Sequence, residues 1–439
     1  MEIPKGWELV KLGDVCTFPQ YGYTTSGAER GNLKPLRTTD ITSGKINWDN
    51  VPFCKENPQD IQKYLLNDGD IVISRAGSVG VSYLIHKPQK SVFASYLIRF
   101  KPFDNIVVEK FFYYFLKSPL YWNEISEKSL GIAVPNVNAS KLKSIPIPLS
   151  PLPEQHRIVD KIEALFSRLD KGIENLKTAQ QQLKVYRQAV LKWAFENTSQ
   201  DEKIKLIDAC EFITKGTTPL KNELFFQKGE IPFLKVYNLT FDGGLDFSID
   251  PTFVSVTTHN GFLKRSKVFP GDVLMNIVGP PLGKVSIVPD TFPEWNINQA
   301  IARFRCKNSL INKYLAYFLL SGDTIRKYAK KAKATVGQFN LTLEICRNIV
   351  IPIPSIPEQQ AIVSAIESRL SVCDKVEEII TYSLKQAEGL RQSILKKAFE
   401  GKLVSQDPND EPASVLLERI KAKNETNKPA KNVKTKKVK

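Results

Sequence analysis

The chain has 439 residues, of which 42% are hydrophobic and 25% are charged, a composition typical of folded globular proteins that excludes wholesale disorder. No apolar run reaches the roughly 18 residues that a membrane helix needs, and the start lacks the features of a signal peptide, so we expect a cytoplasmic protein. The net charge of +16 favours an acidic partner such as nucleic acid.

This positive charge is unevenly distributed along the chain. The end, Arg419–Lys439, holds nine Lys or Arg residues and one acidic residue, so it carries +8, half of the total. Basic ends of this kind are usually solvated, and we predict that residues 405–439 form a basic, disordered tail. The body keeps a modest positive excess, which suits nucleic-acid contact on chosen surfaces.

From residue 1 to 150 the sequence predicts a mixed, strand-rich domain. Its expected elements are a short strand at Leu36–Ile41, a turn at Asn67–Asp70, strands at Ile71–Ser74 and Val92–Phe100, a helix near Val108–Lys117 and a polar loop at Ser129–Lys143. Ile145–Pro148 follows as an extended connector, because its two prolines cannot donate to a central sheet ladder.

One long segment then occurs twice in the chain. Residues 152–196 align without a gap on residues 356–400, and 19 of the 45 positions carry the same residue. Each copy contains Pro-Glu-Gln from its second residue and ends with Ala-Phe-Glu. The chain is therefore a tandem duplication.

Each copy predicts a long helix. Pro153 suits a first helical turn, and apolar residues then recur at alternate spacings of four and three from Ile158 to Trp193, which is a heptad pattern. A helix about 65 Å long would be marginal alone, so we expect the two copies to pack on each other as spacer helices within 151–198 and 356–404. Chain order favours an antiparallel arrangement.

Residues 199–355 repeat the framework of the first domain with different loops. Gly69–Asp70 recurs as Gly271–Asp272, and Ile145–Pro148 recurs as Ile351–Pro354. The predicted fold is α+β: two mixed α/β domains separated by two long helices packed as an antiparallel coiled coil, with an internal pseudo-twofold repeat. A shared framework with different loops indicates two domains that each recognise a different ligand.

No catalytic or metal-binding constellation is recognisable. The six cysteines have no C-x-x-C spacing and only three histidines are present, so we expect free buried thiols. The segment Gly279–Lys284 departs from a phosphate-binding loop, since it has three residues between its glycines and Val285 replaces the required Ser or Thr. A self-contained nuclease or methyltransferase would need an acidic cluster or a glycine-rich cofactor loop, and neither motif is found.

Polar loops in both domains carry the residue types that contact DNA phosphates and base edges. Any single one is more often an ordinary solvated loop residue, but as a set they predict a DNA-binding surface. The candidate DNA-binding residues are Tyr21, Tyr23, Thr24, Arg37, Thr38, Arg75, Ser78, Asn136, Asn138, Lys215, Thr217, Thr218, Lys235, Tyr237, Asn238, Asn276, Lys284, Lys333, Thr335, Gln338 and Asn340.

With two copies of a proline-rich connector, a Pro-Glu-Gln motif, a long helix and an Ala-Phe-Glu end, the chain resembles the specificity subunit of type I restriction-modification systems. The resemblance covers residue 1 to about Glu418. It implies that residues 1–150 and 199–355 are target-recognition domains, each reading one half of a bipartite, asymmetric DNA site, and that the helices set the gap between the halves.

The resemblance also implies partners and cofactors. Two methyltransferase subunits would carry S-adenosylmethionine and methylate adenine, and restriction subunits would use ATP and Mg²⁺ to translocate and cut DNA. This chain itself is expected to bind no cofactor and to catalyse no reaction. The alternative interpretation is a non-catalytic coiled-coil scaffold without specific DNA binding.

Overall fold

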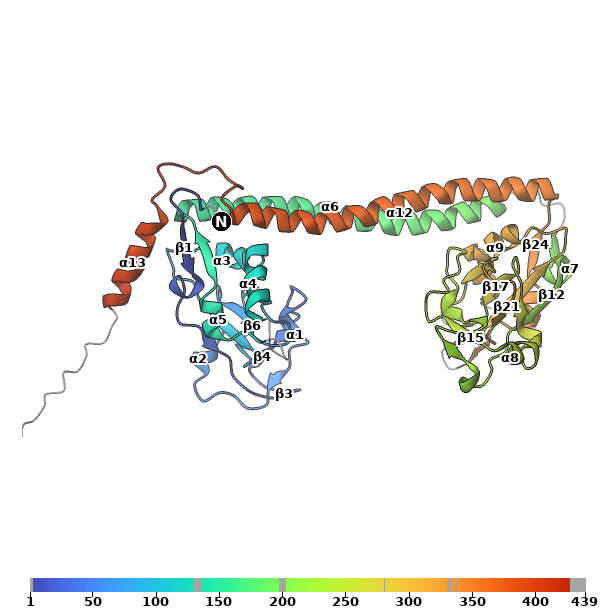
Figure 1. Ribbon diagram of the computed structural model, residues 1–439, viewed down its shortest axis with the longest axis horizontal. Helices are drawn as coiled ribbons and strands as arrows, with labels where there is room; N and C mark the ends of the chain where they lie inside the picture. Colours follow the sequence, from blue (N-terminus) through green and yellow to red (C-terminus); the bar gives the residue numbers. More distant parts are fainter. Residues whose placement is uncertain are drawn as a thin grey trace, which may run out of the picture. The chain divides into compact units, whose positions relative to one another are not determined.

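The computed structural model describes residues 3–129, 136–196, 203–279, 281–329, 333–335 and 338–426. The chain divides into two compact units, and each long helix contributes one part to each unit (Figure 1). The first unit comprises Met1–Asn175 and Ser383–Lys439, and the second comprises Leu176–Tyr382.

Short strands and helices make up the domain of the first unit. Its elements are β1 (Glu8–Lys11), η1 (Leu12–Asp14), β2 (Gln20–Tyr21), β3 (Gly27–Ala28), β4 (Lys34–Leu36), α1 (Thr38–Ile41), β5 (Phe53–Cys54), α2 (Ile61–Tyr64), β6 (Ile71–Ser74), β7 (Ser82–Leu84), β8 (Ser91–Phe93), β9 (Leu97–Phe100), α3 (Glu109–Phe115), α4 (Pro119–Ser129), α5 (Ala139–Lys143) and β10 (Pro146–Leu149).

An antiparallel sheet in the order β2-β9-β6-β7 lies at the centre of this domain. The β-branched strand β6 is buried along its whole length, as expected from its apolar sequence. Beside this sheet, β4 and β8 form a parallel pair, while β3 and β5 form an antiparallel pair. The aromatic helix α3 packs into the same core through Phe111, Phe112 and Phe115.

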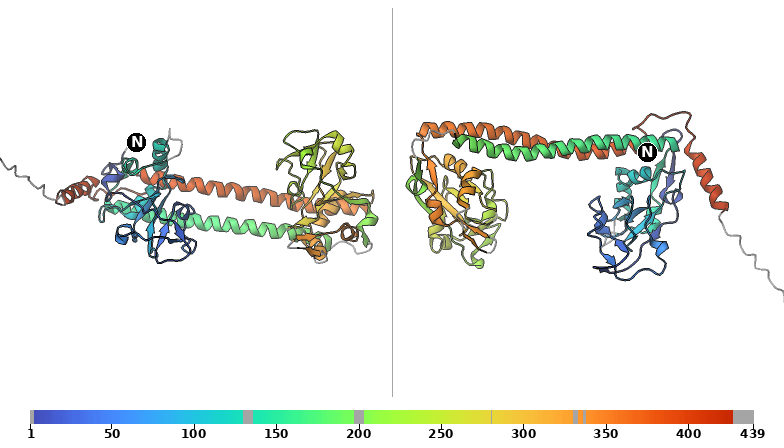
Figure 2. Two further views of the ribbon diagram at one scale, coloured as in Figure 1. Left: turned by 90° about the horizontal axis from the view of Figure 1, so that it is seen from below. Right: turned by 180° about the vertical axis from the view of Figure 1, so that it is seen from behind.

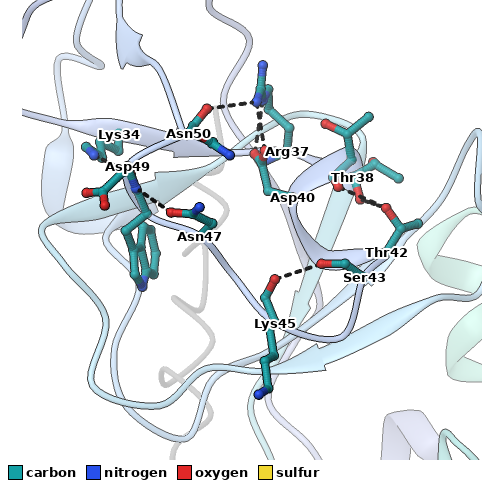
Figure 3. Close-up of polar contacts among 12 residues, drawn as sticks. Lys34, Arg37, Thr38, Asp40, Thr42, Ser43, Lys45, Asn47, Asp49 and Asn50 are labelled. Atoms are coloured by element: carbon teal, nitrogen blue, oxygen red, sulfur yellow. Dashed lines mark hydrogen bonds and ion pairs between the residues drawn. The ribbon is translucent and has the colours of Figure 1, made fainter. Parts of the chain in front are cut away.

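Two of the expected strands were wrong in detail. Residues 38–41 form the short helix α1, because Asp40 accepts a hydrogen bond from the backbone amide of Arg37 at 2.8 Å and pairs with its guanidinium (Figure 3). The segment Val92–Phe100 is two strands separated by a turn, since the amide of Leu97 bonds back to the carbonyl of Ala94 at 2.8 Å. The strand at Ile71–Ser74 is confirmed.

The proline-rich connectors are paired as well as extended. Antiparallel pairing joins β10 to β1 in the first unit and β24 (Val350–Pro352) to β11 (Lys203–Lys205) in the second. Each sheet has only two strands, so the prolines occupy edge positions where a missing amide leaves no central ladder broken.

The domain of the second unit is also rich in short strands. Besides β11 and β24 its elements are α7 (Leu206–Ala209), β12 (Cys210–Lys215), η2 (Lys221–Glu223), β13 (Phe225–Phe226), β14 (Ile231–Leu234), η3 (Val236–Asn238), β15 (Thr252–Val254), α8 (Val256–Asn260), η4 (Lys264–Ser266), β16 (Lys267–Val268), β17 (Val273–Asn276), β18 (Val278–Gly279), β19 (Val285–Ile287), β20 (Trp295–Ile297), β21 (Ile301–Cys306), α9 (Asn312–Leu320), α10 (Gly322–Ala329), β22 (Lys333–Thr335), β23 (Gln338–Asn340) and α11 (Leu343–Arg347).

Its central sheet repeats that of the first unit. The order β12-β21-β17-β19 corresponds to β2-β9-β6-β7, and a second sheet has the order β13-β15-β14-β20-β16. The pair β14 and β20 is parallel, as is its counterpart β4 and β8. The internal repeat therefore extends from the helices into the domain cores.

The repeated segments form the two long helices α6 (Leu152–Glu196) and α12 (Ile356–Phe399), which lie side by side within each unit (Figures 1 and 2). In the first unit Arg391 of α12 pairs with Asp170 of α6. In the second unit Arg187 of α6 pairs with Asp374 of α12 at 2.6 Å. Because the early part of each helix meets the late part of the other, the helices are antiparallel, as predicted.

The heptad interpretation of α6 is confirmed in part. Ile158, Ile162 and Val190 are buried. Tyr186 and Trp193, which were also assigned to the seam, are about half exposed, at 50% and 47%. Trp193 contacts α12, because it lies under the guanidinium of Arg369, with 4.2 Å between the guanidinium carbon and the ring centroid.

Beyond α12 the tail is partly structured, which corrects the prediction of disorder from residue 405. The helix α13 (Ala413–Thr426) follows a short loop, and Ala413 and Leu416 are buried in the core of the first unit. Arg157 of α6 pairs with Asp410 at 2.6 Å and fixes the loop. These apolar and ionic contacts offset the loss of chain entropy, which charge counting alone did not detect. Residues 427–439 lie outside the described residues.

Two exposed glycines in the helices offer a stability test. Gly172 in α6 and Gly389 in α12 have no neighbouring atom within 4 Å of an added Cβ. We expect Gly172→Ala and Gly389→Ala each to raise the free energy of unfolding by up to about 1 kcal/mol, measured by thermal denaturation. Gly401→Ala is the contrasting variant, because φ there is +68° and a Cβ would collide with Pro4. Destabilisation by both helix variants would contradict the expectation.

Candidate DNA interface

A glutamine of the Pro-Glu-Gln motif fastens each long helix to a domain. In the first unit Gln155 Oε1 accepts a hydrogen bond from the amide of Val108 at 2.9 Å. Its Nε2 donates to the carbonyl oxygens of Ile106, at 3.1 Å, and Ser150, at 3.0 Å. The fully buried side-chain amide of Gln155 thus forms hydrogen bonds with three backbone groups, two just before α3 and one just before α6.

The second unit repeats this clamp on different residues. Gln359 Oε1 accepts from the amide of Ile311 at 2.8 Å. Its Nε2 donates to the carbonyl oxygens of Ser309, at 2.8 Å, and Pro354, at 2.9 Å. The Pro-Glu-Gln motif is therefore a docking device that holds each domain in a fixed orientation on the helix that follows it.

The other helix contributes an aromatic anchor to each docking site. In the first unit Phe399 packs against Phe111 and Phe115 of α3, with ring centroids 5.1 and 5.4 Å apart. In the second unit Phe195 packs against Tyr314 and Phe318 of α9 at 5.2 and 5.3 Å. The Ala-Phe-Glu end of one repeat thus completes the docking site begun by the Pro-Glu-Gln of the other.

The glutamates of the two motifs differ in environment. Burial raises the pKa of the Glu154 carboxyl, although the Trp7 indole donates to it at 2.9 Å and partly opposes this effect. Hydrogen bonds from the side chain and amide of Ser355 lower the pKa of Glu358, which lies at the surface. The docking glutamines are equivalent in the two units, and the neighbouring acids are not.

In the first domain the predicted polar segments meet at one turn. This turn, Ala94–Leu97, joins β8 to β9. The amide of Gly22 donates to the carbonyl oxygen of Leu97 at 3.1 Å, and the amide of Tyr23 donates to that of Phe93 at 2.8 Å. A Cβ on Gly22 would collide with the carbonyl oxygen of Ala94, so glycine is required for this close approach.

Two further polar segments attach to the same turn. The amide of Ala94 donates to the carbonyl oxygen of Leu36 at 2.9 Å, which places Arg37 and Thr38 beside it. The amide of Arg75 donates to the carbonyl oxygen of Tyr96 at 2.9 Å. The carbonyl oxygen of Arg75 in turn accepts from the amide of Val137 at 3.0 Å. Four separate segments of candidate residues are thereby joined by backbone hydrogen bonds.

Within this site Tyr21 and Arg75 form a packed pair. The guanidinium carbon of Arg75 lies 5.1 Å from the centroid of the Tyr21 ring. The Tyr21 hydroxyl accepts from the amide of Ala139 at 3.0 Å, next to Asn138, which caps α5. Arg75 Nε is buried and has no hydrogen-bond partner among the described residues, so this arginine retains an unused donor.

Arg37 is more constrained than the sequence indicated. Its guanidinium is held by Asp40 at 2.7 Å and lies 3.5 Å from the carbonyl oxygen of Asn50 (Figure 3). The hydrogen bond to Asp40 raises the pKa of Arg37 further above its usual range. A DNA phosphate would have to compete with this ion pair. Thr24 and Ser78 are exposed, and the ring of Tyr23 lies 5.5 Å from that of Tyr64.

The second domain reproduces the hydrogen bonds of the turn. Its turn, Asn298–Ile301, joins β20 to β21. The amides of Gly216 and Thr217 donate to the carbonyl oxygens of Ile301 and Ile297 at 3.1 and 3.2 Å. The amide of Asn298 donates to the carbonyl oxygen of Leu234 at 3.0 Å, beside Lys235.

The other backbone hydrogen bonds around this turn also correspond to those of the first domain. The amide of Ile277 donates to the carbonyl oxygen of Ala300 at 2.8 Å, and the carbonyl oxygen of Ile277 accepts from Leu341 at 2.8 Å, next to Asn340. Lys215 ends β12 and is exposed. Lys333 and Thr335 lie on β22, and Gln338 and Asn340 lie on β23, which pairs with β18. One backbone framework therefore gathers the candidate segments in both domains.

Two candidate residues of the second domain have structural roles instead. Asn238 is fully buried, and its amide group donates to the carbonyl oxygens of Asp246 and Ile249. Asn276 is fully buried, and its Oδ1 accepts from the amides of Gly283 and Lys284 at 3.0 and 2.9 Å. Their prediction as DNA contacts was wrong, because in this fold their side chains complete loop backbones.

Four other candidates take part in local contacts. Lys235 pairs with Asp250 at 3.0 Å, and the Tyr237 hydroxyl contacts the same carboxylate. Lys284 donates to the carbonyl oxygen of Val236 at 3.3 Å. Thr218 is exposed and its hydroxyl donates to Gln299 Oε1, which places Gln299 in the site.

The sequence missed the two turns at which the segments converge. Val92–Phe100 looked like one strand because the turn contains no glycine, proline or asparagine, the residues that commonly mark turns. The exposed side chains of these turns, Tyr96 and Gln299, were therefore not among the candidates. Alignment of Gly22 with Gly216 between the two domains was the signal in the sequence that could have indicated these turns.

In the part of the chain that the structure describes, no three His, Cys, Asp or Glu side chains are grouped closely enough to hold a metal ion. All six cysteines are free, and five of them are buried, as expected. Every helix in the described ranges is too short or too polar to cross a bilayer.

Residues 4–183 and 199–386 each match the family model of the type I restriction modification DNA specificity domain. The chain belongs to this family. Its two matches correspond to the two domains with their following helices, so the internal repeat is a repeat of the specificity domain.

Full-length relatives support the same assignment. The chain is 27% identical to the EcoKI specificity subunit of Escherichia coli K12, over 96% of each chain. It is 23% identical to the MjaVIII specificity subunit of Methanocaldococcus jannaschii, over 92% of this chain and 94% of that one. This specificity protein therefore matches relatives from a bacterium and from Methanocaldococcus along nearly their whole length.

Solved structures show the same fold. A chain from a structural study of assembly and conformational transition of the type I R-M system superposes with a TM-score of 0.70, at 21% identity, covering 92% of this chain and 100% of that chain. The crystal structure of the HsdS subunit from Thermoanaerobacter tengcongensis gives 0.57 at 21% identity, covering 92% and 98%. Two domains joined by antiparallel helices are thus the architecture of this specificity fold.

Proposed function

We propose that this chain is the DNA-recognition subunit of a type I restriction-modification complex, in which each domain reads one half of a bipartite, asymmetric site. The observation that carries the proposal is the shared backbone framework around the turns Ala94–Leu97 and Asn298–Ile301. The same hydrogen bonds present different side chains in the two domains, which is what reading two different half-sites requires.

The helices would set the gap between the half-sites and dock two methyltransferase subunits, with restriction subunits joining that complex. The duplicated clamps of Gln155 and Gln359 support this role, because they fix each domain to the helix pair through three hydrogen bonds. The methyl donor, ATP and Mg²⁺ would be bound by those partners, and this chain would contribute no catalytic group.

Selection from random double-stranded oligonucleotides tests the proposal. The full chain, co-purified with its methyltransferase subunits, is expected to enrich one motif made of two short half-sites with an unspecified gap. Affinity should fall steeply with salt while the preference for the motif remains, because phosphate contacts supply much of the binding.

Two outcomes would contradict the proposal. Enrichment of no motif would favour a coiled-coil scaffold without specific DNA binding. Methylation or cleavage of DNA by this chain alone would show that it is an enzyme.

A further inference from the structure

Two residues at each of the turns where the polar segments converge occupy equivalent positions in the two domains, and one residue of each two is exposed. In the first domain Ser95 and Tyr96 lie between β8 and β9, and the Tyr96 ring is 61% exposed. In the second domain Gln299 and Ala300 lie between β20 and β21, and Gln299 is exposed.

The backbone of these turns is held rigidly on several sides. Four corresponding backbone hydrogen bonds, between 2.8 and 3.2 Å, join each turn to three other segments of its domain, and a fifth joins the first and last residues of the turn. A glycine packs against each, Gly22 and Gly216, where a Cβ would collide with turn carbonyl oxygens. Side chains on such a support present their groups to a ligand with little loss of conformational entropy on binding.

The side chains on these equivalent supports differ completely in chemistry. Tyr96 has an exposed aromatic ring, and its carbonyl oxygen accepts a hydrogen bond from the amide of Arg75, whereas its counterpart Ala300 has only a methyl group as its side chain. Gln299 has an amide, whereas its counterpart Ser95 has a short hydroxyl. A difference of side chains on a common rigid frame is the arrangement expected of specificity-determining positions.

We infer that these two turns are base-reading elements, with Tyr96 determining specificity in the first half-site and Gln299 in the second. The inference rests on the proposed function and names residues that act within it. Tyr96 would contact bases with its ring and hydroxyl.

The chemistry of Gln299 identifies its base. The hydroxyl of Thr218 donates to Gln299 Oε1 and orients the amide. The second lone pair of Oε1 and the Nε2 donors match the N6 donor and N7 acceptor of adenine in the major groove. Gln299 therefore selects adenine at one position of the second half-site.

The test compares motifs enriched from random duplexes by complexes that contain wild-type chain or one variant. Gln299→Ala should reduce the preference for adenine at one position of the second half-site by about tenfold and leave the first half-site unchanged. Gln299→Glu should move that preference toward cytosine, whose N4 amino group donates to a carboxylate. Tyr96→Ala should alter the first half-site alone.

Matched variants distinguish a change in base preference from a loss of folding. The double variant Ser95→Gln/Tyr96→Ala gives the first turn the residues of the second and should introduce a new adenine preference into the first half-site. Phe18 is an 83% exposed aromatic residue whose ring lies beside Lys143. Phe18→Ala therefore removes an exposed ring outside the turn and should leave both half-sites unchanged. Thermal denaturation checks that every variant is folded.

The outcomes for the inference and for the proposed function are distinguishable. If wild-type chain enriches no bipartite motif, the proposed function fails. If wild-type chain enriches a motif and folded Tyr96→Ala and Gln299→Ala enrich the same one, the inference is overturned. A change at a position where wild-type chain selects a base other than adenine would overturn the assignment of Gln299.

Discussion

Gln155→Ala is expected to lower the free energy of unfolding of the first unit by about 3 kcal/mol, since it leaves buried backbone groups without partners. The lost partners are the amide of Val108 and the carbonyl oxygens of Ile106 and Ser150. Gln359→Ala should have a similar effect on the second unit. Differential scanning calorimetry of the full chain measures both variants.

Two control variants test whether the loss of stability comes from the side-chain amide of Gln155. Gln155→Glu keeps an acceptor for Val108 but sets a carboxylate against two carbonyl oxygens, so it should destabilise the first unit at least as much as alanine does. Gln181→Ala changes an exposed glutamine on α6 and should alter stability by less than about 0.5 kcal/mol. If Gln155→Ala were no worse than Gln181→Ala, the clamp would have no stabilising role.

The clamp also shows what the sequence could predict. Residue identity between the two repeats marked Pro153–Gln155 and Phe195 before any contact was visible. Pattern analysis predicted the helices and their antiparallel packing, because period and chain order are properties of the sequence. It could not show that Gln155 bonds to the backbone in front of α3, since those partners are about 47 residues away along the chain.

The candidate site was predicted less well than the fold. Polar composition located the loops that converge in each domain, yet it could not separate a buried asparagine, such as Asn276, from an exposed one, such as Asn138. The side chains of both residues bond to backbone amides, and only the fold decides which side chain stays accessible to a ligand. The turn at Ser95–Tyr96 was missed because its support comes from distant segments.

The symmetry of the docking contacts connects stability with recognition. Arg187 pairs with Asp374 in one unit, and the repeated residues Arg391 and Asp170 pair in the other. Each helix therefore contributes the same groups at opposite ends of the pair. Evolution of a new half-site can replace the residues around a turn while these ion pairs, the glutamine clamps and the phenylalanine anchors stay in place.

Insertion of one heptad into both long helices is expected to lengthen the gap between the half-sites and to leave both half-sites unchanged. Gly172 follows Asp170 by two residues and Gly389 precedes Arg391 by two, so these glycines lie at the same level of the antiparallel pair. Seven residues inserted after Gly172 and seven before Gly389 keep the ion pairs matched. They add about 10 Å of helix, or about three base pairs of DNA.

An insertion into α6 alone is the control for this experiment. It shifts the residues on one side of the inserted heptad out of register with α12, so that either the pair of Asp170 with Arg391 or that of Arg187 with Asp374 is lost. We expect this single insertion to lower stability and abolish enrichment of any motif.

Selection from random duplexes compares the wild-type chain, the double insertion and the insertion into α6 alone. An unchanged gap in the folded double insertion would contradict the spacer role of the helices, and a changed half-site would contradict the division between reading domains and spacer. The predicted result requires that the helices set the gap and that the turns read the bases, each independently of the other.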